Sequence, residues 1–217
     1  MSSDAIIYAM NSIDIKDLAV VFVCILISLS LHEAMHAFVG HTLGDTTAKD
    51  EGRLTLNPLK HIDIYTTVLL PVILIAMGLR PIFAAKPVPF NPDRVKYDEF
   101  GAAMIAVAGP ATNFGLAGIT AIILRLGHFP LNSTITSWLA TFCFVNIGFF
   151  VFNMIPFPPL DGSRLLYAFA PEPIQRFMKQ IEGFGIGGIL MFMFLLYPFI
   201  SPMIQFITQK IVIFLLG

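Results

Sequence analysis

Long apolar runs separated by short polar stretches dominate the pattern of this 217-residue chain. A membrane-spanning helix needs about 20 consecutive, mostly apolar residues, so the runs predict about five or six membrane-embedded segments. They cover about 17–43, 64–84, 100–124, 135–155 and 183–216. The pattern therefore predicts an all-α polytopic integral membrane protein.

Proline and glycine interrupt two of these segments. Segment 64–84 contains Pro71, Gly78 and Pro81, which favour a broken, re-entrant path that dips into the membrane and returns. The last block, 183–216, carries Tyr-Pro-Phe and Ser-Pro in its middle. It fits either a helical hairpin or one crossing plus a surface helix.

Composition agrees with a location in the bilayer. The chain is 56% hydrophobic and 12% charged, whereas soluble domains carry about 25% charged residues. Its net charge of −1, without a block of basic residues, argues against a nucleic-acid partner. Cys24 and Cys143 both lie in apolar runs, and we expect them to be buried hydrophobes rather than a disulfide or a metal pair.

The most informative polar side chains lie inside the first apolar run, in the sequence HEAMH. His32 and His36 are four residues apart, so a helix places both imidazoles on one face, where they can bind one zinc ion. Glu33 projects beside that face, where a general base for a metal-activated water belongs. The alternative is a pair of histidines hydrogen-bonded to their neighbours. Three unpaired polar groups in hydrocarbon would be costly, which favours the metal site.

A catalytic zinc usually has three protein ligands and an open position. Asp161 is the best third candidate, because it is the first carboxylate after a run without charged residues that begins at Leu126. Prolines precede it and Gly162 lets the backbone turn after it, although an ordinary Asp-Gly turn is the alternative. The other histidines are weaker candidates and are expected to be exposed: His41, His61 and His128.

Three motifs together resemble the site-2 protease family of membrane-embedded zinc metallopeptidases: HEAMH, GPATN and NMIPFPPLDG, in that order within about 20–170. GRLTLNPLKHID and AKPVPFNP resemble a compact branch of the family without a PDZ or CBS domain. The resemblance implies zinc ligands and a catalytic carboxylate at these positions: His32, His36 and Asp161 as ligands, and Glu33 as the carboxylate. It also implies that Asn153 and Asn113 contact the substrate or the oxyanion. For Asn113, an interhelical hydrogen bond is the alternative.

The same resemblance implies an intramembrane zinc metalloendopeptidase with one Zn²⁺ per chain, acting on transmembrane proteins or peptides in regulated intramembrane proteolysis. We expect one domain over 1–217, with a catalytic core at about 17–170 and a C-terminal helical segment at about 183–217. The lipid bilayer is the other expected partner, and the sequence does not specify an oligomeric state. Two alternatives are a proteolytically silent protein that binds transmembrane helices and a membrane zinc transporter or chaperone.

Basic residues indicate how the chain is oriented. They gather in three loops, 41–63, 85–99 and 157–182, whereas 1–16 and 125–134 carry one each. Basic loops stay in the cytoplasm, and a re-entrant second segment places all three there. We therefore expect a multi-pass protein of the cell membrane with its site facing the cytoplasm. The alternative is a full second crossing, with Asp161 reaching mid-membrane.

The proline-rich stretch 85–98 predicts an extended segment with a short β element near the site. In a strand, Pro87 and Pro89 would place their missing N–H groups on one edge, and Val88 and Phe90 would donate from the other. That edge could bind an unwound substrate as an added strand, and a rigid linker is the alternative.

Overall fold

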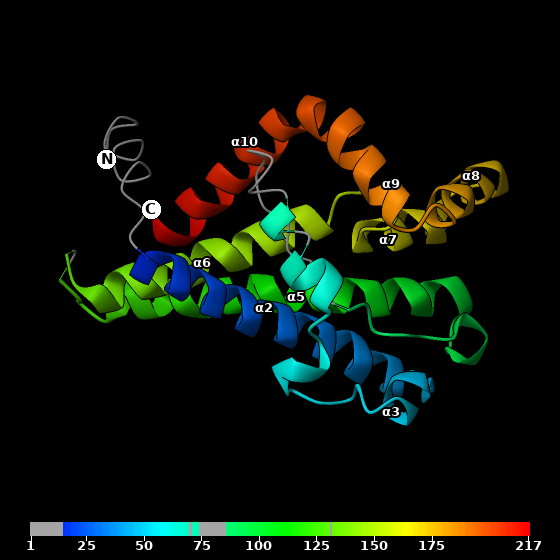
Figure 1. The fold of residues 1–217 in the computed structure, drawn as a ribbon, viewed down its shortest axis with the longest axis horizontal. Coiled ribbons are helices and arrows are strands. Elements are labelled where there is room, and N and C mark those ends of the chain that lie inside the picture. Colours follow the sequence, from blue (N-terminus) through cyan, green and yellow to red (C-terminus); the bar gives the residue numbers. More distant parts are fainter. Residues whose placement is uncertain (1–14, 70, 74–85, 131) are drawn as a thin grey trace.

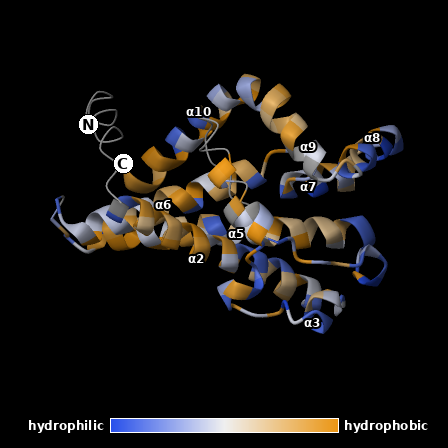
Figure 2. Ribbon diagram, in the orientation of Figure 1, coloured by the Kyte–Doolittle hydropathy of each residue, from blue (hydrophilic) through white to orange (hydrophobic). Residues whose placement is uncertain are grey.

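The computed structural model describes residues 15–69, 71–73, 86–130 and 132–217. Within these ranges, four helices are long and apolar enough to cross a membrane. They are α2 (Ile15–Thr42), α5 (Asp98–Leu126), α6 (Thr134–Asn153) and the run Phe192–Leu216, which ends in α10 (Tyr197–Leu216). Hydrophobic residues dominate along all four (Figure 2). The prediction of an all-α polytopic membrane protein is confirmed.

Three of the long helices, α2, α5 and α6, pack along one another, and α10 leaves α6 diagonally (Figure 1). Where α5 meets α6, the small side chains of Ala117 and Ala121 pack in one cluster with Cys143 and Ile147, all at most 2% exposed. Small residues let helix backbones approach closely in a bilayer, where van der Waals packing drives association. Cys143 and Cys24 are buried free thiols, as predicted.

Shorter elements connect the long helices. They are α3 (Thr47–Asp50), the 3₁₀ turns Pro58–Lys60 and Pro92–Arg94, the π-helical turns Ile64–Leu69 and Phe192–Leu196, α7 (Asp161–Phe169), α8 (Glu172–Glu182) and α9 (Ile186–Met191). The last apolar block is continuously helical from α9 through the π turn into α10. It therefore fits a single crossing rather than a hairpin.

The second apolar segment lies mostly outside the described residues. Only 64–69 and 71–73 of it are described, both helical, so the re-entrant path stays a prediction. Gly78 and Pro81 belong to the part that is not described.

The predicted β element near the site is not formed, since the described residues contain no strand. Residues 86–91 have no regular secondary structure. Pro87 and Pro89 cannot donate a ladder hydrogen bond, and the Val88 N–H donates to a carboxylate of α2. The segment therefore has no strand partner in this part of the chain.

Candidate metal centre

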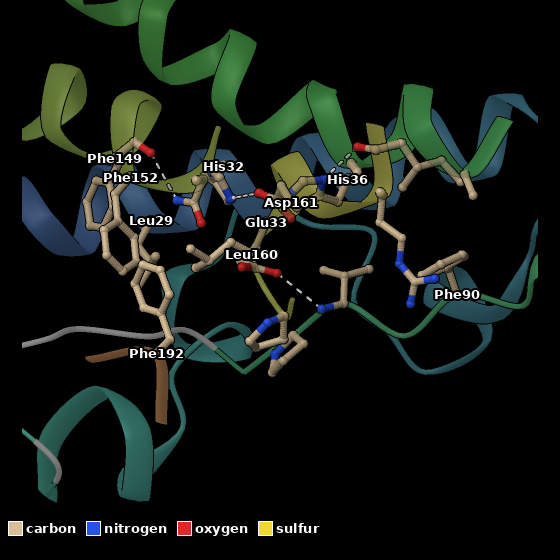
Figure 3. Close-up of a pocket in the computed structure, with 18 residues that line it drawn as sticks. Leu29, His32, Glu33, His36, Phe90, Phe149, Phe152, Leu160, Asp161 and Phe192 are labelled. Atoms are coloured by element: carbon tan, nitrogen blue, oxygen red, sulfur yellow. Dashed lines mark hydrogen bonds and ion pairs between the residues drawn. The ribbon is translucent and has the colours of Figure 1, made fainter. Parts of the chain in front are cut away.

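His32 and His36 from α2 meet Asp161 at the start of α7 (Figure 3). The Nε2 atoms of His32 and His36 lie 3.1 Å and 3.4 Å from Asp161 Oδ2. The two imidazole rings are edge to face, with centroids 4.6 Å apart. Among the described residues, this is the one group of three potential metal ligands whose donor atoms lie within 4.8 Å of one another.

Hydrogen bonds on the far side of each imidazole fix the direction of its lone pair. His32 Nδ1 lies 2.6 Å from Asn113 Oδ1, and His36 Nδ1 lies 2.7 Å from the carbonyl oxygen of Ile105. Both partners are acceptors, so each Nδ1 carries a hydrogen and each neutral ring turns an unprotonated Nε2 toward Asp161.

Asp161 Oδ2 is buried and, within the described ranges, has no hydrogen-bond partner. Two ring lone pairs and a carboxylate oxygen thus face one another, an arrangement that a cation between them relieves. Two histidines and one carboxylate are a ligand set that suits zinc, and each histidine has the supporting acceptor that metal-bound imidazoles usually have. The residues present therefore fit a zinc ion.

The carboxyl group of Asp161 lies outside the membrane-spanning helices. Burial alone raises its pKa, but the two imidazoles beside Oδ2, His36 first, favour the carboxylate whenever they carry a proton, and this outweighs burial. The pKa of Asp161 therefore lies well below its usual range, and the side chain is an anion at neutral pH, as a metal ligand must be.

Glu33 follows His32 on α2 and is 8% exposed. Its Oε2 accepts a hydrogen bond of 3.1 Å from the Val88 backbone N–H, and it does not belong to the group of three ligands. Glu33 lines the same cavity as the histidines and Asp161. The structure therefore places a carboxylate beside the ligand group, where the sequence predicted a base.

Asn113 is hydrogen-bonded to one of the ligands. It is fully buried on α5, with Oδ1 toward His32 and Nδ2 toward Asn146 Oδ1 at 2.8 Å and the Ser28 carbonyl oxygen at 3.3 Å. Its amide makes hydrogen bonds through both its oxygen and its nitrogen, and Asn113 does not line the cavity. This arrangement favours the alternative, an interhelical hydrogen bond that orients a ligand, and contact with the substrate or the oxyanion stays a prediction. The supporting Asn146 was missed, although a buried amide in an uncharged run is itself a signal.

Asn153 lies at the end of α6 and lines the cavity, as a substrate-contacting residue must. One N–H of its amide donates to the Phe149 carbonyl oxygen at 3.0 Å. Within the described part of the chain, the second N–H has no acceptor and is available to a ligand.

The remaining histidines do not join the ligand group. His128 is exposed, as predicted, and His41 is partly buried. His61 is 1% exposed, so the expectation of a solvated side chain was wrong. The loop folds around it, with Nε2 2.8 Å from the Thr55 carbonyl oxygen and its own carbonyl accepting from the Lys86 N–H at 3.0 Å.

Two glycines make room for the ligands. A Cβ on Gly109 of α5 would lie 2.4 Å from His36 Nε2 and 2.7 Å from His32 Cε1. A Cβ on Gly162 would lie 2.4 Å from the Met154 carbonyl oxygen. The first glycine lets α5 approach the imidazoles, and the second lets the start of α7 pack against the preceding turn.

The ligand group borders a cavity of about 350 Å³ (Figure 3). Glu33, Arg164 and Asn153 are further polar side chains in its wall. The rest of the wall is mostly apolar, and includes Leu29, Val88, Phe90, Phe149, Phe152, Leu160 and Phe192. A ligand set for one zinc ion and a neighbouring carboxylate, set among apolar helices, define a membrane-embedded centre of the zinc-hydrolase type.

Comparison with known proteins identifies the family. The model of Peptidase family M50 matches residues 127–196, which include Asp161 and Asn153. "Putative zinc metalloprotease YwhC" of Bacillus subtilis (strain 168) is 31% identical over 188 residues, which cover 83% of this chain and 80% of the relative. This chain belongs to peptidase family M50 and is a zinc-dependent, membrane-embedded protease.

Two other relatives are matched over smaller shares of their own length. "Putative zinc metalloprotease Rip2" of Mycolicibacterium smegmatis is 31% identical over 160 residues, which cover 74% of this chain and 61% of the relative. "Zinc metalloprotease MJ0392" of Methanocaldococcus jannaschii is 25% identical over 196 residues, which cover 90% of this chain and 48% of the relative. No solved structure matches the chain significantly.

Proposed function

We propose that this protease is an intramembrane zinc metalloendopeptidase that cleaves peptide bonds in or near transmembrane segments of membrane-anchored proteins, as in regulated intramembrane proteolysis. The observation that carries the proposal is the position of the site. His32, His36 and Glu33 lie on an apolar helix long enough to span the bilayer, and the cavity beside them is mostly apolar. Such a wall suits the side chains of a transmembrane segment better than those of a soluble peptide.

His32, His36 and Asp161 would hold the zinc ion. When bound, zinc supplies a Lewis acid that activates water and polarises a carbonyl group. Glu33 takes a proton from the attacking water and later delivers it to the leaving amine. The free amide N–H of Asn153 donates to the oxygen on which negative charge develops. A silent helix-binding protein would not need Glu33 beside an intact ligand set, which makes the proteolytic function the better supported one.

The size of the cavity favours an unwound substrate. Its volume of about 350 Å³ lies at the low end of the range for small-molecule pockets, roughly 300–1,000 Å³. A helix with its side chains is about 10–12 Å across, and its amides are shielded by their own hydrogen bonds. We therefore propose that the substrate enters as a short extended segment, which residues that weaken helices near the cut would promote.

Cleavage of a designed transmembrane peptide in proteoliposomes tests this function. We expect the zinc-loaded protein to cut a peptide with a central Gly-Pro pair inside its apolar span, and to cut a matched all-leucine span at least about tenfold more slowly, because unwinding the latter costs more. Chelation of zinc should abolish the cut. Cleavage of soluble peptides alone would contradict the intramembrane proposal and leave the coarser assignment as a zinc protease intact.

We also propose that the site faces the cytoplasm, on the strength of the basic loops around it. Phe90 lines the cavity and is partly exposed, whereas Cys24 and Cys143 are buried. A Phe90→Cys variant should therefore react with a membrane-impermeant thiol reagent in inverted vesicles and not in right-side-out cells. Labelling from the outside would place the cavity on the opposite side and would also contradict the re-entrant second segment.

A further inference from the structure

Residues 86–91, here called the strap, run along the cavity and contact the predicted base. Pro87, Val88 and Phe90 of the strap line the cavity. Pro87 and Pro89 have no N–H, so Val88 is the residue between them that can donate, and it donates to Glu33 Oε2 at 3.1 Å. The strap therefore fixes one oxygen of the Glu33 carboxylate.

A buried charged side chain holds each end of the strap. At one end, Arg53 Nη2 donates to the Lys86 carbonyl oxygen at 2.6 Å. At the other end, Asp45 Oδ2 accepts from the Asn91 N–H at 2.7 Å. Arg53 is 3% exposed and Asp45 is 2% exposed. Hydrogen bonds that involve an ionised partner are roughly twice as strong as neutral ones, so both ends are held firmly.

Asp45 is anchored in its own loop. Its Oδ1 accepts from the Thr47 N–H at 3.0 Å and from the Thr47 hydroxyl at 2.6 Å. Burial raises the pKa of Asp45. The bonds from Thr47, the bond from Asn91 and the nearby charge of Arg94 lower the pKa by more, so it falls below its usual value. Asp45 is therefore an anion at neutral pH with a donor on each oxygen.

Arg53 is less well satisfied. Its Nε and Nη1 atoms are buried and have no hydrogen-bond partner among the residues that the structure describes. A buried guanidinium with two unpaired nitrogens costs stability, so its one strong bond to the strap is the feature that accounts for its position. The adjacent Lys86 N–H donates to the carbonyl oxygen of the buried His61, which makes this end of the strap part of the same loop.

We infer that Asp45 and Arg53 are positioning residues for catalysis: by holding both ends of the strap, they keep the Val88 N–H in place and so fix the orientation of Glu33. The inference rests on the proposed role of Glu33 as the base. Neither residue touches the cavity, and each acts through the strap. A displacement of about 1 Å in a reacting group can lower a rate by about 10²-fold. We therefore expect loss of Asp45 or Arg53 to lower kcat rather than to raise KM.

Steady-state cleavage of the transmembrane peptide tests this chain of contacts. Asp45→Asn and Arg53→Gln should each lower kcat by about 10- to 100-fold, with KM within about twofold of wild type and one zinc per chain. Asn57→Ala is the matched control, because it removes a similar bond in the same loop, Leu59 N–H to Asn57 Oδ1 at 3.1 Å, that does not touch the strap. A loss of kcat in step with lost zinc or lost folded protein would mean a structural role only, and would overturn the inference.

A double variant shows whether Asp45 acts through Val88. Val88→Pro removes the donor to Glu33 and leaves both ends of the strap in place. If Asp45 works through this N–H, Asp45→Asn should add little to the loss that Val88→Pro causes alone. Losses that multiply in the double variant would mean that Asp45 acts by another route.

Hydrogen exchange of the strap gives a readout that does not depend on activity. The strap has few amides because of its prolines, and those of Val88 and Asn91 should be protected in the wild type. Asp45→Asn should speed exchange at both. Faster exchange at Asn91 alone would overturn the inference. The wild type could show the expected exchange at Val88 and Asn91 and yet cleave no peptide. That result would contradict the proposed function but not the structural link between Asp45 and Glu33.

Discussion

Glu33→Gln should keep one zinc per chain and lower the rate of peptide cleavage by about 10²- to 10⁴-fold. Glutamine has the same shape and retains a side-chain oxygen that can accept from the Val88 N–H. It cannot take a proton at neutral pH. Because Glu33 is not among the three ligand side chains, zinc binding should not need its charge.

Zinc content and single-turnover cleavage, measured on the same purified sample, check this result. Glu51→Gln is the matched control, because it removes an equal charge from an exposed position at the end of α3. Cleavage by Glu33→Gln at the wild-type rate would exclude Glu33 as the base. Loss of zinc in this variant would mean that the Glu33 carboxylate supports the metal and would leave its role as the base undemonstrated.

The ligand group was predictable because it depends on local rules. Helical periodicity places His32 and His36 on one face whatever the rest of the fold does. Asp161 stood out because a carboxylate that ends a long uncharged run in a membrane protein requires a partner. The long helices were predictable for a related reason, since the bilayer sets the length and composition of a helix that spans it.

The supporting contacts were not predictable because they join residues far apart in the chain. The bonds from Asn113 to His32 and from Asn91 to Asp45 depend on how whole elements pack. His61 looked solvated since its neighbours in the sequence are polar, yet its loop closes over it. The predicted β element is absent from the described residues for a similar reason, because the Val88 N–H donates to a side-chain acceptor rather than to a neighbouring strand.

The tightest constraint on the metal centre comes from a residue with no side chain. Gly109 lies on α5 directly against the two imidazoles, and a Cβ there would lie 2.4 Å from His36 Nε2 and 2.6 Å from His36 Cε1. Real Cβ atoms essentially never approach another heavy atom this closely. The Nδ1 atom of each ring is also hydrogen-bonded, that of His36 to the Ile105 carbonyl oxygen and that of His32 to Asn113 Oδ1. Neither ring can therefore move without losing its hydrogen bond.

Gly109→Ala should therefore displace the ligands and lower zinc affinity by at least about 10- to 100-fold, the range seen when support of metal ligands is lost. Cleavage should fall with the zinc content, and added zinc should restore part of it. Metal analysis after equilibration against a zinc buffer, together with cleavage assays at several zinc concentrations, measures both.

Gly115→Ala is the matched control for this substitution. It lies on the same helix, and a Cβ at Gly115 would meet nothing within 4 Å. The two variants make the same chemical change and have the same effect on helix propensity, so a difference between them reports the contact with the imidazoles. If the Gly109→Ala variant bound zinc and cleaved peptide to the same extent as the Gly115→Ala variant, the imidazole rings would have to be free to turn away from the added methyl group. The rigid ligand geometry on which the metal centre is built would then be wrong.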